Sequence, residues 1–250
     1  MKKTLYLILG ILLLPLALGA QSLPKAEESF AKGDYSSALT QYKQLMQSAT
    51  GEERLHAQLR YAACQYGLGE YLNAAKTIWN YPLPENDLWK VRFLLYRIQI
   101  SDQAASVYRR LLNERQIDSN DAQNDPESWT QAEWESRITQ DYETLWAMRA
   151  ALINFPVERE TLILNIKETD TQRIPTLFDY VVFEWRNRLT AQKTVVLARL
   201  ENAEYLDGYA EVVPQQKEQA EKLAYLLKTA YLLDGKGRQN AKIFWQTDFI

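Results

Sequence analysis

The chain contains few of the residues on which most active sites depend. Its 250 residues include one histidine, His56, and one cysteine, Cys64. A single imidazole excludes metal sites with several histidine ligands, and a single thiol excludes an intramolecular disulfide. The two residues are eight positions apart on one predicted helix, which is roughly two turns and too far for a nucleophile and its base. We therefore expect no enzyme activity, no metal or cofactor site, and a buried Cys64.

Glycine, proline and basic residues are also scarce. Nine glycines and eight prolines leave no long linker or low-complexity tract. The glycine pairs at 67–69 and 235–237 lack the strand-then-helix context of a phosphate-binding loop, so we interpret both as helix ends. The formal net charge is −3. Because phosphate binding needs basic clusters, this charge argues against nucleic acid as a partner.

The first twenty residues are typical of a secretory signal peptide. They comprise a basic start, an apolar run and small residues before a cleavage site: Lys2 and Lys3, residues 5–16, and Ala17, Gly19 and Ala20. Cleavage after Gly19 or after Ala20 fits the pattern. An uncleaved membrane anchor is the alternative, although a span needs roughly 20 apolar residues. We assign residues 1–20 to the signal peptide and predict export to the periplasm or surface of a bacterium. Removing 20 residues, including two lysines, leaves 230 residues with a net charge of −5.

Two similar stretches, residues 33–42 and 69–78, organise the front of the chain. Each reads glycine, acid, tyrosine, two spacers, alanine, three spacers and a large residue. This order is typical of the turn and second helix of a repeating helical hairpin of about 34 residues. The two glycines are 36 residues apart, and the apolar positions of each stretch share one helical face. The pattern resembles the tetratricopeptide repeat. That resemblance implies antiparallel helix hairpins over residues 22–112, within an all-α fold.

A third hairpin is expected in a degenerate form. Residues 88–98 are strongly apolar, and Ser101-Asp102 takes the place of the glycine turn. Repeat arrays bind partners along a concave surface, which is lined mainly by the first helix of each hairpin. The predicted protein-binding groove comprises polar and aromatic residues beside the apolar stripe: Gln58, Tyr61, Gln65, Arg92 and Tyr96. For the two tyrosines, packing between repeats is the alternative.

The remainder of the chain is predicted to be helical without repeats. Residues 113–126 form an acidic loop, which lacks the central glycine and final glutamate of a calcium-binding loop. The region 127–250 follows. Its first helix is predicted over 127–154, with Ser128 as the N-cap, Gln131 completing a capping box, and an apolar stripe that we assign to the core.

Later segments of this region are less regular. Residues 162–166 are ambiguous between strand and helix. Pro175 is expected in the first turn of another helix, whose buried face begins at Phe178. A last long helix is expected from Pro214. Three large apolar residues at 243–245 suggest one of two alternatives: the chain is truncated at its C-terminus, or it packs against something downstream.

The middle of the chain suggests a narrower resemblance. Trp134, Ile138 and Asp141-Tyr142 on one helix, followed by residues 173–180, resemble the N-terminal helical region of some bacterial alpha-2-macroglobulins. Phe178 stands where that family commonly has tyrosine. The resemblance implies a large cell-envelope protein that traps proteases, with this chain as its N-terminal part. The bait region and Cys-x-Glu-Gln thioester motif of that family are missing from this sequence, so no functional residue carries over.

These patterns lead to two main hypotheses. The first is a non-catalytic, exported protein-interaction module that forms the N-terminal part of an alpha-2-macroglobulin-like inhibitor. Its partners would be a protein or peptide, or downstream domains of the same polypeptide. The second is a stand-alone tetratricopeptide scaffold that assembles a cell-envelope complex. An enzyme with an unrecognised helical fold is the third alternative, and a hydrolase activity that depends on Cys64 or His56 would indicate it.

Overall fold

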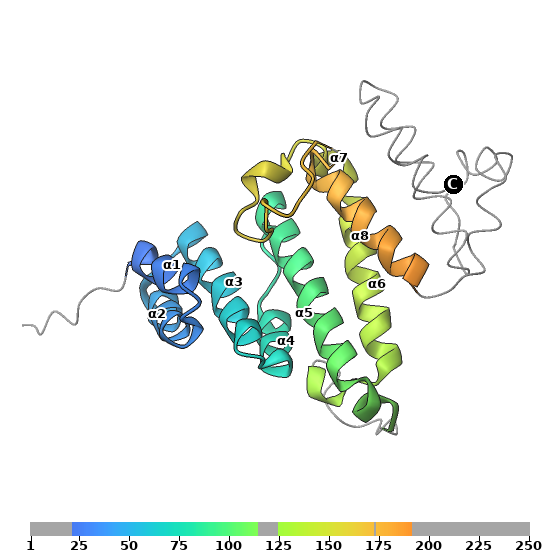
Figure 1. The fold of residues 1–250 in the computed structure, drawn as a ribbon, viewed down its shortest axis with the longest axis horizontal. Coiled ribbons are helices and arrows are strands. Elements are labelled where there is room, and N and C mark those ends of the chain that lie inside the picture. The colour runs from blue at the N-terminus through green and yellow to red at the C-terminus, as the bar shows by residue number, and fades with distance from the viewer. Residues whose placement is uncertain (1–21, 115–124, 173, 192–250) are drawn as a thin grey trace, which may run out of the picture. The chain divides into compact units, whose positions relative to one another are not determined.

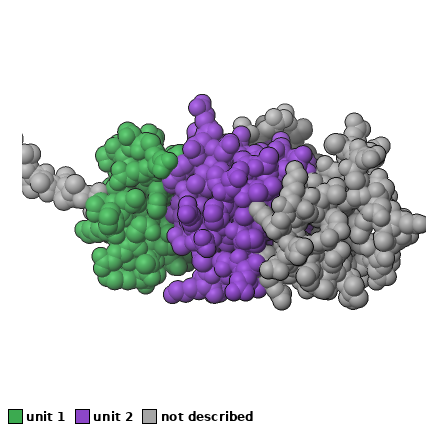
Figure 2. Space-filling model, turned by 90° about the horizontal axis from the view of Figure 1, so that it is seen from above, with its two compact units in different colours: residues 1–68 green, residues 69–250 purple. Residues whose placement is uncertain are grey.

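The computed structural model describes residues 22–114, 125–172 and 174–191 of this chain (Figure 1). Those ranges contain eight α-helices and two short 3-10 helices, and no β-strand forms within them. The predicted all-α class is therefore confirmed. Predictions for residues 1–21, for most of the acidic loop and for everything after residue 191 fall outside the described residues. The chain divides after Leu68 into two compact units, which we describe separately (Figure 2).

Unit 1 contains α1 (Leu23–Ala31), α2 (Tyr35–Ser48) and α3 (Gly51–Gly67). The helix–turn–helix predicted at its start is present. Gly33 reverses the chain with a φ of 76°, in the left-handed region that glycine adopts without strain. Asp34 then begins α2, because its carboxylate accepts a hydrogen bond from the Ser37 N–H at 3.1 Å. α2 packs against both α1 and α3.

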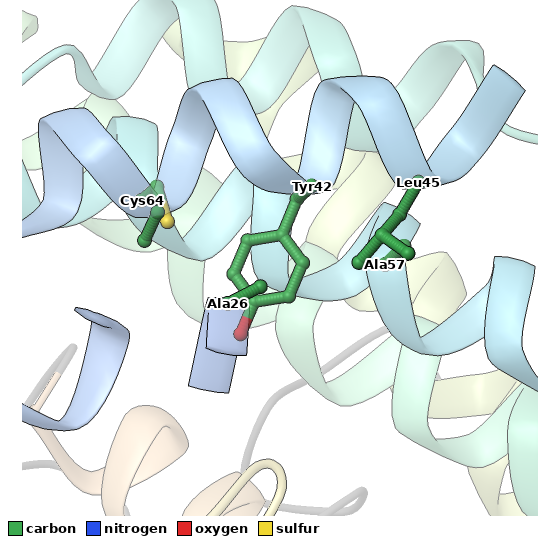
Figure 3. Close-up of a cluster of buried hydrophobic side chains, with 6 residues drawn as sticks. Ala26, Tyr42, Leu45, Ala57 and Cys64 are labelled. Atoms are coloured by element: carbon green, nitrogen blue, oxygen red, sulfur yellow. The ribbon is translucent and has the colours of Figure 1, made fainter. Parts of the chain in front are cut away.

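The core of unit 1 is built around the ring of Tyr42 (Figure 3). The fully buried small residues around it are one alanine from each helix: Ala26, Ala38 and Ala57. Small side chains let helix axes approach closely, and a large side chain fills the space that remains. Leu45 and Cys64 complete the cluster. The predicted shared face of the stretch 33–42 is present, since Ala38 and Tyr42 are both buried on α2.

Unit 2 contains the remaining described helices. They are α4 (Tyr71–Asn80), α5 (Asp87–Glu114), η1 (Pro126–Ser128), α6 (Gln131–Ala147), α7 (Arg149–Leu152), η2 (Val157–Arg159) and α8 (Leu177–Ala191). α5 packs against α4 and α6, and α8 packs against α6 and α7. Figure 1 shows α5 and α6 side by side and antiparallel, with α8 returning along α6. None of the helices in the described ranges is both long and apolar enough to cross a membrane.

The turn predicted at Ser101-Asp102 is wrong. α5 continues through this point as one helix of 28 residues. Ser101 is fully buried, and its hydroxyl accepts a hydrogen bond from the Trp79 Nε1–H at 3.0 Å. Ala104 and Ala105 extend the buried stripe of the same helix. Since no glycine is available here to reverse the chain, the apolar stripe continues and a separate third hairpin does not form.

The helix predicted over 127–154 begins later and breaks once. The capping box at its start is Thr130 with Glu133: the Thr130 N–H donates to Glu133 Oε2 at 2.7 Å, and the Glu133 N–H donates to Thr130 Oγ1 at 3.3 Å. The predicted box of Ser128 with Gln131 is therefore wrong, because Ser128 lies in η1. α6 ends at Ala147, and α7 follows. The apolar stripe predicted for the core is buried at Trp134, Ile138, Tyr142, Leu145 and Leu152, and partly buried at Met148.

The segment between α7 and α8 is irregular. Residues 162–166 form turns, so neither of the two alternatives for them holds. α8 begins at Leu177, two residues after Pro175, so the expected place of Pro175 in the first helical turn is wrong. Thr176 caps the helix instead. Its hydroxyl donates a hydrogen bond to Asp179 Oδ2 at 2.6 Å, and the Asp179 N–H donates to Thr176 Oγ1 at 3.4 Å. The predicted buried face from Phe178 to Trp185 is confirmed.

Candidate protein-binding surface

Three of the five predicted groove residues lie on α3. Gln58 and Tyr61 are partly buried, and Tyr61 packs against the core cluster of unit 1. Gln65 is buried, with 8% of its surface exposed, and no described residue pairs with its Oε1 atom. Successive residues of a helix turn by about 100°, so these three side chains share one side of α3. Of these three residues, Gln58 has an amide side chain that solvent can reach.

The opposite side of α3 carries an ionic cluster that the sequence patterns did not reveal. The Glu27 carboxylate on α1 accepts hydrogen bonds from His56 Nε2 at 2.8 Å and from Arg60 Nε at 2.9 Å, both on α3. Arg60 Nη2 donates to the second carboxylate oxygen at 3.1 Å. The Tyr42 hydroxyl on α2 donates to the same carboxylate. One carboxylate therefore joins all three helices of unit 1.

The electrostatics of this cluster favour an ionised carboxylate. Burial alone would raise the pKa of Glu27, but hydrogen bonds from His56, Arg60 and Tyr42 outweigh it and lower the pKa to about 2. The Arg60 guanidinium also lies over the Phe30 ring, 4.2 Å from its centroid. The side chain of Arg60 is 11% exposed and that of Glu27 is 31% exposed. A carboxylate held in this way acts as a structural acceptor for its three donors.

Cys64 and His56 do not form a nucleophile–base pair. Cys64 is fully buried and unpaired with any other cysteine, as the sequence predicts. Burial raises the pKa of its thiol to about 12. Because the thiolate is the nucleophilic form, a thiol with this pKa is unreactive near neutral pH. His56 directs its Nε2 atom to Glu27 instead.

The other two predicted groove residues lie on α5 in unit 2. Arg92 forms a two-pronged ion pair with Glu160, with Nε–Oε2 and Nη2–Oε1 distances of 2.8 and 3.2 Å. The Glu160 side chain is 3% exposed, and the Arg92 guanidinium also stacks over Trp89 at 4.6 Å. Tyr96 is partly buried. Arg92 therefore has a structural partner 68 residues away, and it lies in a different unit from Gln58.

A second buried ion pair in unit 2 was also missed at the sequence level. Arg97 on α5 donates to both oxygens of Asp141 on α6, one of them at 2.6 Å, and its guanidinium lies 3.7 Å from the Trp79 ring centroid. Burial raises the pKa of Asp141, and the charges of Arg97 and Arg137 oppose that shift. The partners are 44 residues apart, so helix periodicity could place each on its helix without revealing the pair.

Neither a metal site among the described residues nor a known relative guides the assignment further. In the part of the chain that the structure describes, no group of three or more histidine, cysteine, aspartate and glutamate side chains is arranged to hold a metal ion. No protein-family model, curated protein or solved structure matches the chain significantly. The resemblances to tetratricopeptide repeats and to alpha-2-macroglobulins therefore depend on their sequence motifs alone.

Proposed function

We propose that this chain is an exported, non-catalytic helical module that binds a protein or peptide partner through the side of α3 that carries Gln58 and Tyr61. The observation that carries the proposal is the placement of these side chains. They lie partly exposed beside Ala57 and Leu59, which are fully buried and hold α3 in place. A polar and an aromatic side chain on a rigid helix face is a common composition for a recognition surface.

The chemistry of two residues supports the proposed non-catalytic role. The one histidine of the chain contacts a carboxylate in an ionic cluster, and the one cysteine is a buried thiol with a raised pKa. Export is supported by the basic, apolar and small residues at 1–20. These observations favour a binding role over an acyl-transfer or thiol-dependent reaction.

In its finer form, the proposal makes this chain the N-terminal part of a bacterial alpha-2-macroglobulin-like protease inhibitor. The two middle motifs support this form. The first motif lies on α6, and residues 177–180 of the second open α8, which packs against α6. Further along α8, the Trp185 ring stacks on that of Tyr142 with centroids 5.4 Å apart. A reading frame that continues past Ile250 into β-rich domains would support this form further.

The second candidate is a stand-alone tetratricopeptide scaffold that assembles a cell-envelope complex. The hairpin of α1 and α2 supports it, since Gly33 and Ala38 play the turn and close-packing parts that such a repeat requires. A stop codon directly after Ile250, together with a compactly folded product, would favour this candidate over the inhibitor.

Site-specific photo-crosslinking tests the binding surface in either case. A photoreactive amino acid replaces Gln58 on α3, and in a matched variant it replaces Gln44, an exposed residue of α2. Both variants are expressed in the native host as the full chain. We expect one discrete crosslinked protein from position 58 and none from position 44. Equal crosslinking from both positions, or none from position 58, would contradict the proposed surface.

A further inference from the structure

A pocket in unit 2 takes no part in the proposed protein-binding surface. It lies between α5, residues 163–170 with Ile174 of the segment before α8, and α8 itself, and it has a volume of about 500 Å³. Pockets that hold small organic molecules generally have volumes of about 300–1,000 Å³. The space is therefore large enough for a small molecule or for one long side chain.

The lining of this pocket combines an apolar wall with three carboxylates. Ile163, Ile174 and Phe183 contribute apolar surface. The acidic residues around it come from both the irregular segment and α8: Glu168, Asp170 and Glu184. Among the described lining residues there is no lysine, arginine or histidine. A pocket lined by both apolar side chains and carboxylates is complementary to a molecule with an aliphatic body and a cationic end.

Glu184 is the least exposed of the three carboxylates, since Glu168 and Asp170 are exposed. It is partly buried on α8, and burial and the charge of Asp102 both raise the pKa of Glu184, while Arg186 opposes them. No hydrogen bond from the described residues contributes to its ionisation. Asp102 itself is paired with Arg188. Glu184 is thus a partly desolvated carboxylate near another negative charge, and a cation in the pocket would offset both costs.

We propose that this pocket binds an organic cation, an alkyl ammonium or alkyl guanidinium, with its charged end on Glu184 and its methylene chain against Ile163, Ile174 and Phe183. The ion pair supplies charge-assisted hydrogen bonds in a site partly shielded from water, and the methylene groups bury apolar surface. The same chemistry could come from a free amine or from a lysine or arginine side chain of a peptide. The site is separate from Gln58 and does not depend on the function of α3.

Calorimetric titration of the full chain with matched probes tests this site. Pentylamine and butylguanidine represent free cations, and pentanol is the neutral control. N-acetyl-lysine amide represents a peptide side chain, and N-acetyl-norleucine amide is its neutral control. We expect saturable binding of the cations and none of the neutral probes. Tighter binding of the free amines would assign the site to a small molecule, and tighter binding of acetyl-lysine amide would assign it to a peptide.

Three variants connect binding to the pocket. Glu184→Gln should lower the affinity for the cation at least about tenfold, because one charge-assisted hydrogen bond is lost. Glu158→Gln, at an exposed residue outside the pocket, should leave the affinity within about twofold. Asn165→Trp, at an exposed lining residue, should block the pocket by its bulk. Because ionised Glu184 is unfavourable in the folded state, Glu184→Gln should fold at least as stably as the parent chain, and a thermal melt verifies this.

Several results would overturn the proposal. One is the lack of saturable binding by any cation up to about 10 mM, a concentration that would reveal even weak sites. Another is equal binding of pentanol and pentylamine, which would show an apolar cavity without a charge requirement. Unchanged affinity in both Glu184→Gln and Asn165→Trp would place any observed binding elsewhere on the chain.

Discussion

Glu27 is a single carboxylate on which three helices converge. Its pKa is lowered from the ordinary 4.5 to about 2, since hydrogen bonds from His56, Arg60 and Tyr42 outweigh the effect of burial. A depressed folded-state pKa stabilises the fold above the unfolded-state value, and that stability is lost as the pH falls through the folded-state value. The loss for Glu27 is therefore expected between about pH 4.5 and pH 2.

We predict that Glu27→Gln lowers the free energy of unfolding by about 1–2 kcal/mol at pH 7, because solvent partly screens the cluster. Urea titrations from pH 7 to pH 2 measure this. The variant should also lose part of the acid-dependent decrease seen in the parent chain. Glu28→Gln is the matched control, since the Glu28–Lys32 pair lies at the surface and its loss should hardly change the urea midpoint. Similar effects of the two substitutions would contradict the structural role of the cluster.

Cys64 offers a second test on the scale of one residue. Its thiol is fully buried and its pKa is raised to about 12, so both access and ionisation are suppressed. We predict that a maleimide or disulfide reagent labels the native chain at least about 100-fold more slowly than the urea-unfolded chain. A native labelling rate close to that of a free thiol would show that Cys64 is exposed and the helix packing around it is wrong.

Among the helices, α5 differs most clearly from the sequence pattern. The pattern predicts a turn at Ser101-Asp102, whereas the structure has a continuous helix from Asp87 to Glu114. Gln103→Pro distinguishes the two arrangements. If the chain turned at 101–102, residue 103 would lie in the first turn of a new helix, where proline is tolerated. In the interior of a helix, proline costs about 3 kcal/mol. We predict the larger loss, measured by urea unfolding and far-ultraviolet circular dichroism.

Gln103→Ala is the control for this substitution, because alanine keeps the helix and changes only a partly buried side chain. It should change the free energy of unfolding by about 0.5 kcal/mol or less. If proline and alanine at this position were equally tolerated, α5 would have to be two helices. That result would support the predicted third hairpin.

The start of α6 shows why the sequence predicted a helix but placed its first turn incorrectly. Ser128 with Gln131 and Thr130 with Glu133 both have the spacing of a capping box. The choice between them depends on packing from outside the helix. Trp129 is 1% exposed and lies edge-on to Trp79 and Trp134, which keeps residue 129 before the helix rather than within it. Local spacing alone could not supply that information.

Across the described residues, every feature predicted correctly depends on nearby residues, and none of the features that join distant residues was predicted. The turn at Gly33 follows from the adjacent glycine and acid, and the buried stripe of α6 follows from spacings of three and four residues. The ion pairs Arg60–Glu27, Arg97–Asp141 and Arg92–Glu160 join residues 33, 44 and 68 positions apart. Charged residues on a helix face usually lie in solvent, so their sequence positions do not indicate which of them are paired.

The Arg92–Glu160 pair changes how the binding surface should be tested. Arg92→Ala would leave Glu160 buried without its guanidinium, and we predict a loss of about 3 kcal/mol in the free energy of unfolding. Urea unfolding of this variant measures the loss. A change of less than about 1 kcal/mol would show that the pair is not structural and that Arg92 is free to bind a partner. With the predicted loss, weakened binding by Arg92 variants would report stability rather than contact.

The central claim is that the chain binds its partner through the Gln58 side of α3, and affinity for the crosslinked partner tests it most directly. The full chain, Gln58→Arg and Gln44→Arg are titrated against the purified partner, with thermal melts to verify folding. Gln58→Arg places a bulky charge at the interface and should lower the affinity for the partner at least about tenfold. The affinity of Gln44→Arg should stay within about twofold of that of the parent chain. Equal affinities for all three folded proteins would contradict the claim.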